Sequence, residues 1–429
     1  MINEALLKQI LVEQKELVKQ REDYIERESL KEVRKFIKLK HIIVITGHRR
    51  AGKSVFLSQI INNFYGGDNV YYLNLDDERL IGLHTDDLNT VMELFHQLFG
   101  AKKVIFLDEI QNLEGWERFV SRLLNQGYKI YITGSNANLL SSELASFLTG
   151  RYLEIKIFPF SFREFLHFKN IPIEKIEREK SYYITEIKAT IKNLLNEYLK
   201  WGGFPEMVKY NEPAILRTLF FDVITKDVVN RYNINEPKTL KEIAHYLLSN
   251  IANEFSYNRI KNTYSIGSVH TVKTYLDYLT STYMVFEVPK FSHAVREIHT
   301  RSKKIYAIDN GFFSSAGFTT THNSGRLLEN LVFIELKRRG KEVYYYKDAR
   351  NREVDFVIKE NNRITEAIQV CYNISNEKVR KREISSLLAG MKNLGLKKGL
   401  ILTMDTEEKI SVEGYQVEFY PVWRWLLGW

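Results

Sequence analysis

The chain has 429 residues, of which 44% are hydrophobic, and its 62 Lys and Arg residues against 53 Asp and Glu residues give a net charge of +9. No apolar run is long enough to cross a bilayer, the charged N-terminal stretch is unlike a signal peptide, and the single cysteine, Cys371, excludes an internal disulfide. We therefore expect a cytoplasmic protein of two to four domains with no membrane partner, and the basic surplus favours a polyanionic partner.

The N-terminal stretch, residues 1–40, begins with a charged amphipathic pattern and predicts a helical segment. An apolar run, IIVIT, and the octapeptide GHRRAGKS (47–54) follow it. Gly47, four residues, and then Gly52, Lys53 and Ser54 fit the P-loop pattern, in which a strand, a glycine-bearing turn and a helix N-terminus come in this order.

A P-loop binds a nucleotide through its backbone. Glycine lets successive N–H groups curl around a polyphosphate, and the dipole of the next helix adds positive potential. Lys53 is expected to reach the β and γ phosphates, and the Ser54 hydroxyl to coordinate Mg²⁺. The alternative is a glycine-rich turn without a ligand, which the order of strand, motif and helix disfavours. The residues expected to contact the nucleotide are Gly47, His48, Arg49, Arg50, Ala51, Gly52, Lys53, Ser54 and Val55.

Two acids end the next buried strand, in KKVIFLDEIQ (102–111). Asp108 and Glu109 follow four apolar residues and so lie at the carboxyl end of the strand, where ligands bind in parallel α/β sheets. Asp108 is suited to contact Mg²⁺ directly or through water, and Glu109 to orient or deprotonate the attacking water. The alternative is that both acids only cap the next helix.

A third strand, in KIYITGSNA (129–137), ends in polar residues. Ser135 and Asn136 would contact the γ-phosphate or its water, or else only shape a turn. Arg151 precedes a further strand, and it would either stabilise transferring charge, in its own chain or across a subunit boundary, or pair with a surface acid. The candidate catalytic residues are therefore Lys53, Asp108, Glu109 and Arg151.

The motifs GHRRAGKS, VIFLDEIQ, YITGSNA and LTGRYLEIKIFPFSFREF, in this order, resemble the predicted AAA+ superfamily ATPases of archaea and bacteria, and GGFPE (202–206) adds to the likeness. FPFSFREF and GGFPE are much narrower signals than the first two motifs, which many P-loop proteins share. The resemblance covers nearly the whole chain. It implies an α/β P-loop ATPase domain of three layers (α/β/α) with a helical lid over residues 41–230, ATP and Mg²⁺ as ligands, a winged-helix segment and a terminal nuclease-like domain.

Residues 231–300 predict two amphipathic helices and a strand pair, because apolar residues recur at helical spacing twice before MVFEVPKF. This order resembles a winged-helix module, whose second helix can enter a DNA major groove. The exposed side of that helix carries one lysine, so DNA reading and packing against a protein both stay open. The residues on that side are Ser268, His270, Thr271, Lys273 and Thr274.

Residues 301–429 resemble the PD-(D/E)XK nuclease fold, an α/β fold of the restriction-endonuclease type. In that fold carboxylates hold metal ions and a lysine helps to position water. The resemblance matches Glu329 to the helix acid and Asp355 to the aspartate of the second strand. Where an acid and a lysine belong, this chain has Gln369 and Cys371. The metal site is therefore expected to be degenerate.

Residues near this degenerate site leave alternatives open. Glu366 or Lys378 could compensate from nearby positions. The basic runs at 335–341 and 378–382 could contact phosphates without cutting, or could be solvated helix faces. A nucleophilic Cys371 is disfavoured, because no histidine follows it in the chain.

Three functions are compatible with these patterns. The first is a Mg²⁺-dependent ATPase that couples hydrolysis to DNA binding or remodelling, with the C-terminal domain as a clamp that cuts feebly or not at all. The second is an ATP-dependent switch that acts on a protein partner, and the third is an ATP-regulated DNA nuclease. The sequence has no heptad seam or assembly motif, so a homo-oligomer in which Arg151 acts across subunits also stays open.

Overall fold

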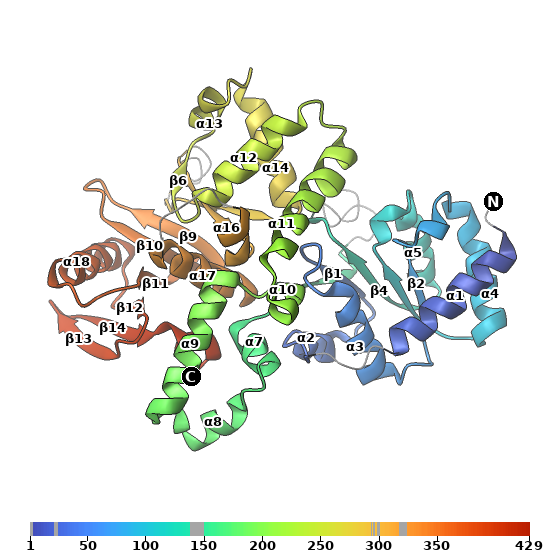
Figure 1. The fold of residues 1–429 in the computed structure, drawn as a ribbon, viewed down its shortest axis with the longest axis horizontal. Helices are drawn as coiled ribbons and strands as arrows, with labels where there is room; N and C mark the ends of the chain where they lie inside the picture. Colours follow the sequence, from blue (N-terminus) through green and yellow to red (C-terminus); the bar gives the residue numbers. More distant parts are fainter. Residues whose placement is uncertain are drawn as a thin grey trace. The chain divides into compact units, whose positions relative to one another are not determined.

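The computed structural model describes residues 3–20, 25–137, 150–292, 294, 297, 301–316 and 324–429, and its helices and strands are labelled in Figure 1. The chain divides into two compact units, Met1–Phe158 and Pro159–Trp429. Within the described ranges, none of the helices combines the length and the apolar character that a membrane crossing requires.

The first unit is built around a five-stranded parallel sheet with the order β2-β3-β4-β1-β5. Strand β4 lies between β1 and β3, so the carboxyl ends of these three strands are neighbours. Every residue of β1 is buried, as in a strand covered on both faces. The strands are β1 (Ile42–Thr46), β2 (Tyr71–Asn74), β3 (Val104–Asp108), β4 (Lys129–Gly134) and β5 (Tyr152–Lys156).

Helices cover both faces of this sheet. Val44 and Ile132 pack with α1, α4 and α5, whereas the adjacent residues Ile43 and Tyr131 pack with α2 and α3, because neighbouring side chains of a strand point to opposite faces. The unit is therefore an α/β fold of three layers with a parallel sheet, typical of a P-loop AAA+ domain. The helices are α1 (Glu4–Lys19), α2 (Leu30–Phe36), α3 (Lys53–Tyr65), α4 (Leu88–Phe99) and α5 (Trp116–Asn125).

The N-terminal helix α1 is part of this core. Leu7, Ile10 and Leu11 are at most 2% exposed and belong to the same apolar cluster as Val44 of β1. The segment that the sequence distinguishes as residues 1–40 thus folds with the ATPase-type sheet.

The second unit starts with helices, and the turn at the GGFPE motif is fixed by tight packing. Gly202 has a φ of 73°, and a Cβ there would lie 1.7 Å from the Asp309 carboxylate. A Cβ on Gly203 would lie 2.3 Å from the Phe160 carbonyl oxygen. Only glycine fits at both points. The helices are α7 (Phe162–Phe168), α8 (Ile173–Glu179), α9 (Thr185–Trp201), α10 (Pro205–Tyr210) and α11 (Pro213–Asp222).

These contacts explain why the units divide at Phe158 and not near residue 230, the boundary expected from the sequence. Asp309 accepts hydrogen bonds from the N–H of Gly203 (2.7 Å) and of Gly311 (2.8 Å). The Phe160 N–H donates to the Gly203 carbonyl at 2.7 Å. The helices expected to form an ATPase lid are therefore bonded to residues of the C-terminal half.

The middle of the second unit contains a small sheet of order β6-β8-β7, in which β8 pairs antiparallel with both neighbours. The sequence assigned β8 to the C-terminal domain, and the pairing joins it instead to strands on the other side of the expected boundary at 300. The elements, in chain order, are α12 (Pro237–Ser249), β6 (Glu254–Phe255), α13 (Tyr257–Thr263), α14 (Val269–Ser281), β7 (Val285–Pro289), β8 (Lys303–Ala307) and α16 (Asn310–Ala316).

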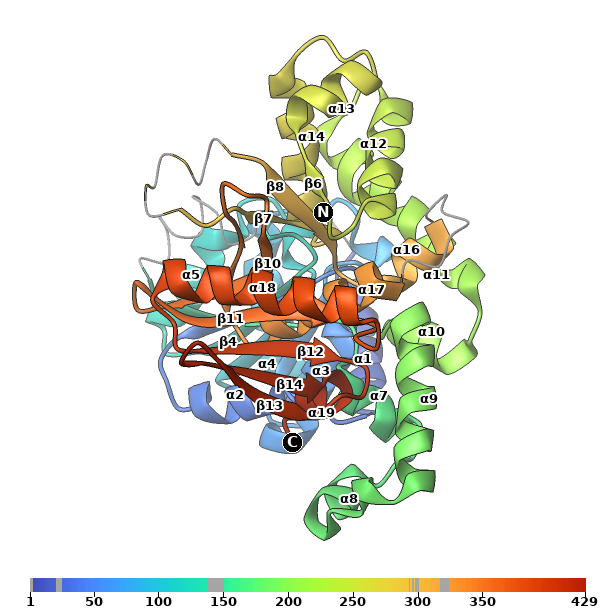
Figure 2. The same ribbon diagram turned by 90° about the vertical axis from the view of Figure 1, so that its left-hand side faces the viewer.

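The C-terminal part contains a mixed six-stranded sheet of order β13-β14-β12-β11-β10-β9. Helix α18 covers one face of it, as Figure 2 shows, with Leu387 packed against Val357. On the other face, the Phe333 ring of α17 stacks against Phe356, at 6.3 Å between centroids. The elements are α17 (Ser324–Arg338), β9 (Glu342–Lys347), β10 (Glu353–Glu360), β11 (Arg363–Cys371), α18 (Glu377–Leu394), β12 (Lys398–Thr403), β13 (Glu408–Val412), β14 (Tyr415–Pro421) and α19 (Val422–Leu427).

Candidate functional site

The P-loop joins β1 to α3 through a turn that requires glycine at two points. Gly47 has a φ of 149°, and a Cβ there would lie 2.1 Å from the Ile157 carbonyl oxygen. Gly52 has a φ of 98° and immediately precedes α3. The loop and the first turn of the helix therefore offer the backbone N–H groups and the dipole that bind a phosphate.

Lys53 and Glu109 are brought together beside this loop. The Lys53 Nζ lies 3.3 Å from the Glu109 Oε1, and it donates to the carbonyl oxygens of Gly47 (3.3 Å) and His48 (3.4 Å). The Lys53 side chain is only 4% exposed, and that of Glu109 is 18% exposed. A cation predicted to bind phosphate and an acid predicted to activate water are thus in contact.

Asp108 is completely buried at the end of β3. Its carboxylate accepts hydrogen bonds from the hydroxyls of Tyr72 (3.0 Å) and Thr133. Burial, followed by the negative charge of Glu109, raises the pKa of Asp108, although the Ser54 hydroxyl acts to lower it. A hydroxyl and a carboxylate side by side are oxygen ligands of the kind that Mg²⁺ takes, so Ser54 and Asp108 fit the predicted ion.

The surroundings of Glu109 hold its carboxylate in the ionised form. Burial opposes its ionisation, but the Lys53 ammonium and then the hydrogen bond donated by Gln111 outweigh burial, and its pKa is lowered. The carboxylate is therefore ionised at neutral pH, as a base must be. Its backbone has a left-handed φ of 51°, and its N–H donates to the Thr133 Oγ1 at 2.8 Å.

The other predicted nucleotide contacts lie in the loop or at the neighbouring strand end. Ser135 and Asn136 follow β4, are each 5% exposed, and lie between the ends of β1 and β3. Burial lowers the pKa of His48 to about 3, so its imidazole is neutral at physiological pH. Ala51 is buried, Arg49 and Val55 are partly buried, and Arg50 is exposed.

Arg151 is not brought to this site. It immediately precedes β5, and its carbonyl accepts from the N–H of Ile42 at the start of β1. Because β1 and β5 are parallel, Arg151 lies at the amino edge of the sheet, whereas the P-loop leaves the carboxyl edge. The guanidinium donates to the Asn125 side chain at 3.2 Å. The interpretation in which Arg151 stabilises charge in its own chain is therefore wrong.

The sequence did not assign a role to two residues that support the site, Thr133 and Arg27. The Thr133 hydroxyl donates to Asp108 and accepts from the N–H of Glu109. Thr133 lies on β4, between β1 and β3, and this position could have indicated its role. Arg27 is 4% exposed and donates to the Ala51 carbonyl at 2.9 Å, so it supports the P-loop from an N-terminal segment that contains no motif.

A second lysine–carboxylate cluster lies in the C-terminal half. Lys304 of β8, 3% exposed, contacts Glu329 at 2.8 Å, Glu353 at 2.6 Å and Asp355 at 3.6 Å. The Tyr306 hydroxyl also donates to Glu329 at 2.7 Å. Burial, followed by the charge of Glu329, holds the pKa of Asp355 well above its usual range, although Lys304 opposes this. Glu329 and Asp355 thus share one cation, Lys304, and the sequence had indicated neither Lys304 nor Glu353 as a member of this cluster.

The two residues that depart from the nuclease pattern have other contacts. The Gln369 amide donates to Glu383 of α18 at 2.7 Å. Burial, followed by the charge of Glu383, raises the pKa of the Cys371 thiol to about 11, which keeps it protonated.

The residues considered as substitutes do not reach the Lys304 cluster. Glu366 contacts Lys341 at 3.3 Å, and Lys378 is exposed at the start of α18. Across the described part of the chain, no group of three or more His, Cys, Asp or Glu residues is arranged to hold a metal ion.

A family model described as an AAA domain matches residues 39–166, and models described as domains of unknown function, DUF8612 and DUF4143, match 192–322 and 324–425. The uncharacterized protein MJ1544 of Methanocaldococcus jannaschii is 38% identical over 403 residues, which is 90% of this chain and 88% of that protein. An uncharacterized protein of Haemophilus influenzae is 32% identical over 397 residues, which is 89% of this chain and 94% of that protein.

Among solved structures, the Aeropyrum pernix ORC1 protein in complex with DNA is similar over 67% of this chain and 90% of that chain, at 11% identity and a TM-score of 0.31. A likeness at this score carries no argument about function. The identity and coverage of the two relatives show the family. The chain carries an AAA domain and belongs to the family of the uncharacterized protein MJ1544 of Methanocaldococcus jannaschii.

Proposed function

We propose that the chain is a Mg²⁺-dependent ATPase whose hydrolysis is coupled to DNA binding or remodelling. One observation carries the ATPase part of the proposal. The Lys53 ammonium lies 3.3 Å from the Glu109 carboxylate, directly beside a glycine-dependent P-loop. A polyphosphate bound on the loop would therefore have a cation and an ionised acid within reach of its terminal phosphate.

Each residue has a separate role in this proposal. Lys53 moves from the loop carbonyls and Glu109 to the β and γ phosphates, which frees the Glu109 carboxylate to orient and deprotonate water. Ser54 and Asp108 would hold Mg²⁺, which when bound neutralises phosphate oxygens. Thr133 holds Asp108 and the backbone of Glu109 in place, so positioning does not depend on the nucleotide.

DNA is the proposed partner because the chain has a net charge of +9 and two basic runs, at 335–341 and 378–382, in its second half. The order of α12, β6, α13, α14, β7 and β8 supports a winged-helix interpretation of the middle segment. The Lys304 cluster supports a C-terminal domain that binds without cutting, because an internal ammonium takes the place where a nuclease needs a metal ion.

Steady-state ATP hydrolysis tests both parts of the proposal. Turnover is measured with Mg²⁺ and with excess EDTA, each with no nucleic acid and with single-stranded, duplex and branched DNA at low salt. We expect turnover that requires Mg²⁺ and rises with at least one DNA. Nucleotide binding without turnover would favour the protein-switch function instead, and turnover that no DNA stimulates would contradict the DNA coupling.

A further inference from the structure

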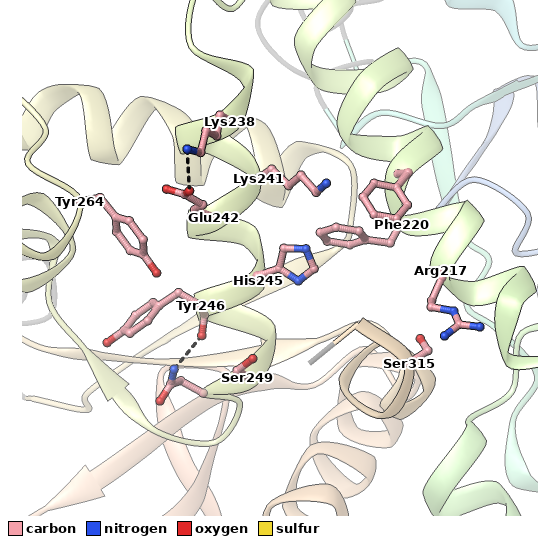
Figure 3. A pocket seen from close by; sticks show the side chains of 12 residues that line it. Arg217, Phe220, Lys238, Lys241, Glu242, His245, Tyr246, Ser249, Tyr264 and Ser315 are labelled. Atoms are coloured by element: carbon pink, nitrogen blue, oxygen red, sulfur yellow. Dashed lines mark hydrogen bonds and ion pairs between the residues drawn. The ribbon is translucent and has the colours of Figure 1, made fainter. Parts of the chain in front are cut away.

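A pocket of about 720 Å³ lies in the second unit between α11, α12 and the end of α13, and no residue of either lysine–carboxylate cluster lines it. Figure 3 shows the Lys241 and His245 side chains of α12 directed toward the side of the pocket where Phe220 of α11 lies. Its described lining combines basic and aromatic side chains with a single acid, Glu242. No role in the proposed ATPase reaction uses these residues.

The positive charge in this pocket is largely uncompensated. Arg217 and Lys241 form no ion pair with any residue in the described ranges. Lys238 lies 4.0 Å from Glu242, but its side chain is 90% exposed, and such an exposed pair contributes little. The pocket therefore favours an anion, and an arginine beside lysines suits a phosphate in particular.

The aromatic side chains of the pocket favour a ligand that contains a flat ring. Phe221 is 44% exposed although it is large and apolar, and the Lys241 Nζ lies 4.1 Å from its ring centroid. The Phe220 and His245 rings lie 4.5 Å apart, and the Tyr246 and Tyr264 rings lie 6.1 Å apart at 78°. Aromatic faces combined with cations are the pattern by which proteins bind unpaired bases and their phosphates.

We propose that this pocket binds an unstacked nucleobase with its flanking phosphates, presented by single-stranded DNA. A duplex offers only base edges, whereas a concave aromatic pocket needs a base face. The proposal deepens the DNA-coupled part of the proposed function and rests on it. It also places the DNA contact on α11 and α12 and not on α14, the helix that a winged-helix interpretation would put in a major groove. The exposed side of α14 has only one lysine, Lys273.

Fluorescence anisotropy of a labelled twelve-residue oligothymidylate with the full chain tests the charged part of the pocket. The double variant Arg217→Ala, Lys241→Ala is expected to weaken binding by at least about tenfold and to lower the slope of log K against log salt by about 1.4, for two lost phosphate contacts. The control, Lys175→Ala with Arg178→Ala on α8, removes the same charges from exposed positions and should leave both quantities nearly unchanged.

A second variant tests stacking. Phe221→Ala is expected to weaken binding by about tenfold without changing the salt slope, since it removes a ring and no charge. The control is Tyr210→Ala. Tyr210 is another exposed aromatic residue, and the Lys209 Nζ lies 5.3 Å from the centroid of its ring. Circular dichroism confirms that each variant is folded.

Competition identifies the source of the ligand. We expect unlabelled oligothymidylate to displace the probe at far lower concentration than duplex DNA, thymidine monophosphate or polyglutamate. Equal displacement by polyglutamate, or wild-type binding by the pocket variants, would overturn the proposal. ATP turnover is measured in parallel, with and without DNA: if turnover is absent in both cases while the pocket variants lose oligonucleotide binding, the ATPase proposal fails and the pocket proposal stands.

Discussion

Lys53 and Lys304 are both buried against carboxylates, and they differ in what surrounds them. Lys53 contacts one acid and two backbone carbonyls in a loop that a glycine turn leaves open to a phosphate. Lys304 contacts three acids, and a tyrosine hydroxyl binds one of those acids as well. A polyphosphate can replace the partners of the Lys53 ammonium. The Lys304 ammonium already neutralises the acids around it. A buried lysine–acid pair alone does not distinguish a ligand site from an internal ion pair. The number and type of the lysine's other partners distinguish them.

Removing Lys304 should have the largest effect on stability. Lys304→Met leaves the buried Asp355 and the partly buried Glu329 and Glu353 without their cation, which costs about 3–5 kcal/mol of unfolding free energy. The second unit contains Trp201, Trp423, Trp425 and Trp429, so tryptophan fluorescence during urea unfolding reports on it.

Lys303→Met is the matched control for this prediction. Lys303 is the adjacent residue and pairs with the single acid Glu287 at a partly buried position, so its loss should cost clearly less than the loss of Lys304. Equal losses for the two variants would contradict the role assigned to Lys304. Cleavage of plasmid DNA with Mg²⁺ or Mn²⁺, abolished by Asp355→Ala, would also contradict a closed cluster.

Removing Lys53 should instead affect ligand binding and activity. Lys53→Ala deletes a cation from a polyphosphate site, and we expect kcat/KM for ATP to fall about 10²- to 10³-fold. Calorimetric titration with ATP should show weakened binding, and urea unfolding should show less destabilisation than Lys304→Met, since Lys53 holds a single acid. Unchanged ATP affinity would remove Lys53 from the binding site.

The sequence predicted the first of these clusters much better than the second. Asp108 and Glu109 stand at the end of an apolar strand, and Lys53 begins the helix after the P-loop motif, so the strand pattern, the motif and the geometry of parallel sheets were enough to bring them together. Glu329 and Asp355 were found only through a resemblance. Lys304 was missed because the pattern KKIYA indicates only a strand. That strand, β8, belongs to the small middle sheet, and it brings Lys304 to acids of α17 and β10, which no local pattern indicates.

Arg151 and the domain boundary show the same limit. The distance from Arg151 to the P-loop depends on which edge of the sheet it occupies, and the motif LTGRYLEI does not contain that information. Likewise, GGFPE indicates a sharp turn, but its partner Asp309 is distant in sequence. Local patterns identified elements and strand-end residues, whereas contacts between distant segments required the structure.

Asp309 shows how a buried acid behaves without a lysine beside it. Burial raises the pKa of Asp309 to about 7, although two backbone N–H groups oppose the shift. The folded chain thus binds one more proton than the unfolded chain between pH about 4 and about 7, and stability should fall as pH rises through this window, by at most about 1.4 kcal/mol per pH unit. Asp309→Asn should remove this dependence in urea unfolding measured from pH 4 to 8.

Asp405 gives a control of opposite sign. Although burial opposes its ionisation, hydrogen bonds from Lys188 and Lys192 lower the pKa of Asp405. Its ionised carboxylate therefore stabilises the fold above the unfolded pKa, and this stabilisation is lost as pH falls. Asp405→Asn should therefore reduce the loss of stability in acid. A wild-type-like pH profile for Asp309→Asn would contradict the role assigned to burial.

The smallest effect is expected at Arg151. Because its guanidinium contacts Asn125 at the amino edge of the sheet, Arg151→Ala should change kcat and KM for ATP less than twofold. Arg118→Ala, an exposed arginine of α5, is the control. A tenfold loss specific to Arg151→Ala, together with wild-type turnover per chain that rises with protein concentration, would instead mean that Arg151 acts on a neighbouring subunit.

The most direct test of the ATPase assignment is Glu109→Gln, which keeps the shape of the side chain and removes its charge. The predicted result is ATP affinity within about threefold of wild type, with kcat lowered about 10²- to 10⁴-fold, as for the loss of a general base. Normal turnover by this variant, with ATP bound, would contradict the assignment of Glu109 as the residue that activates water.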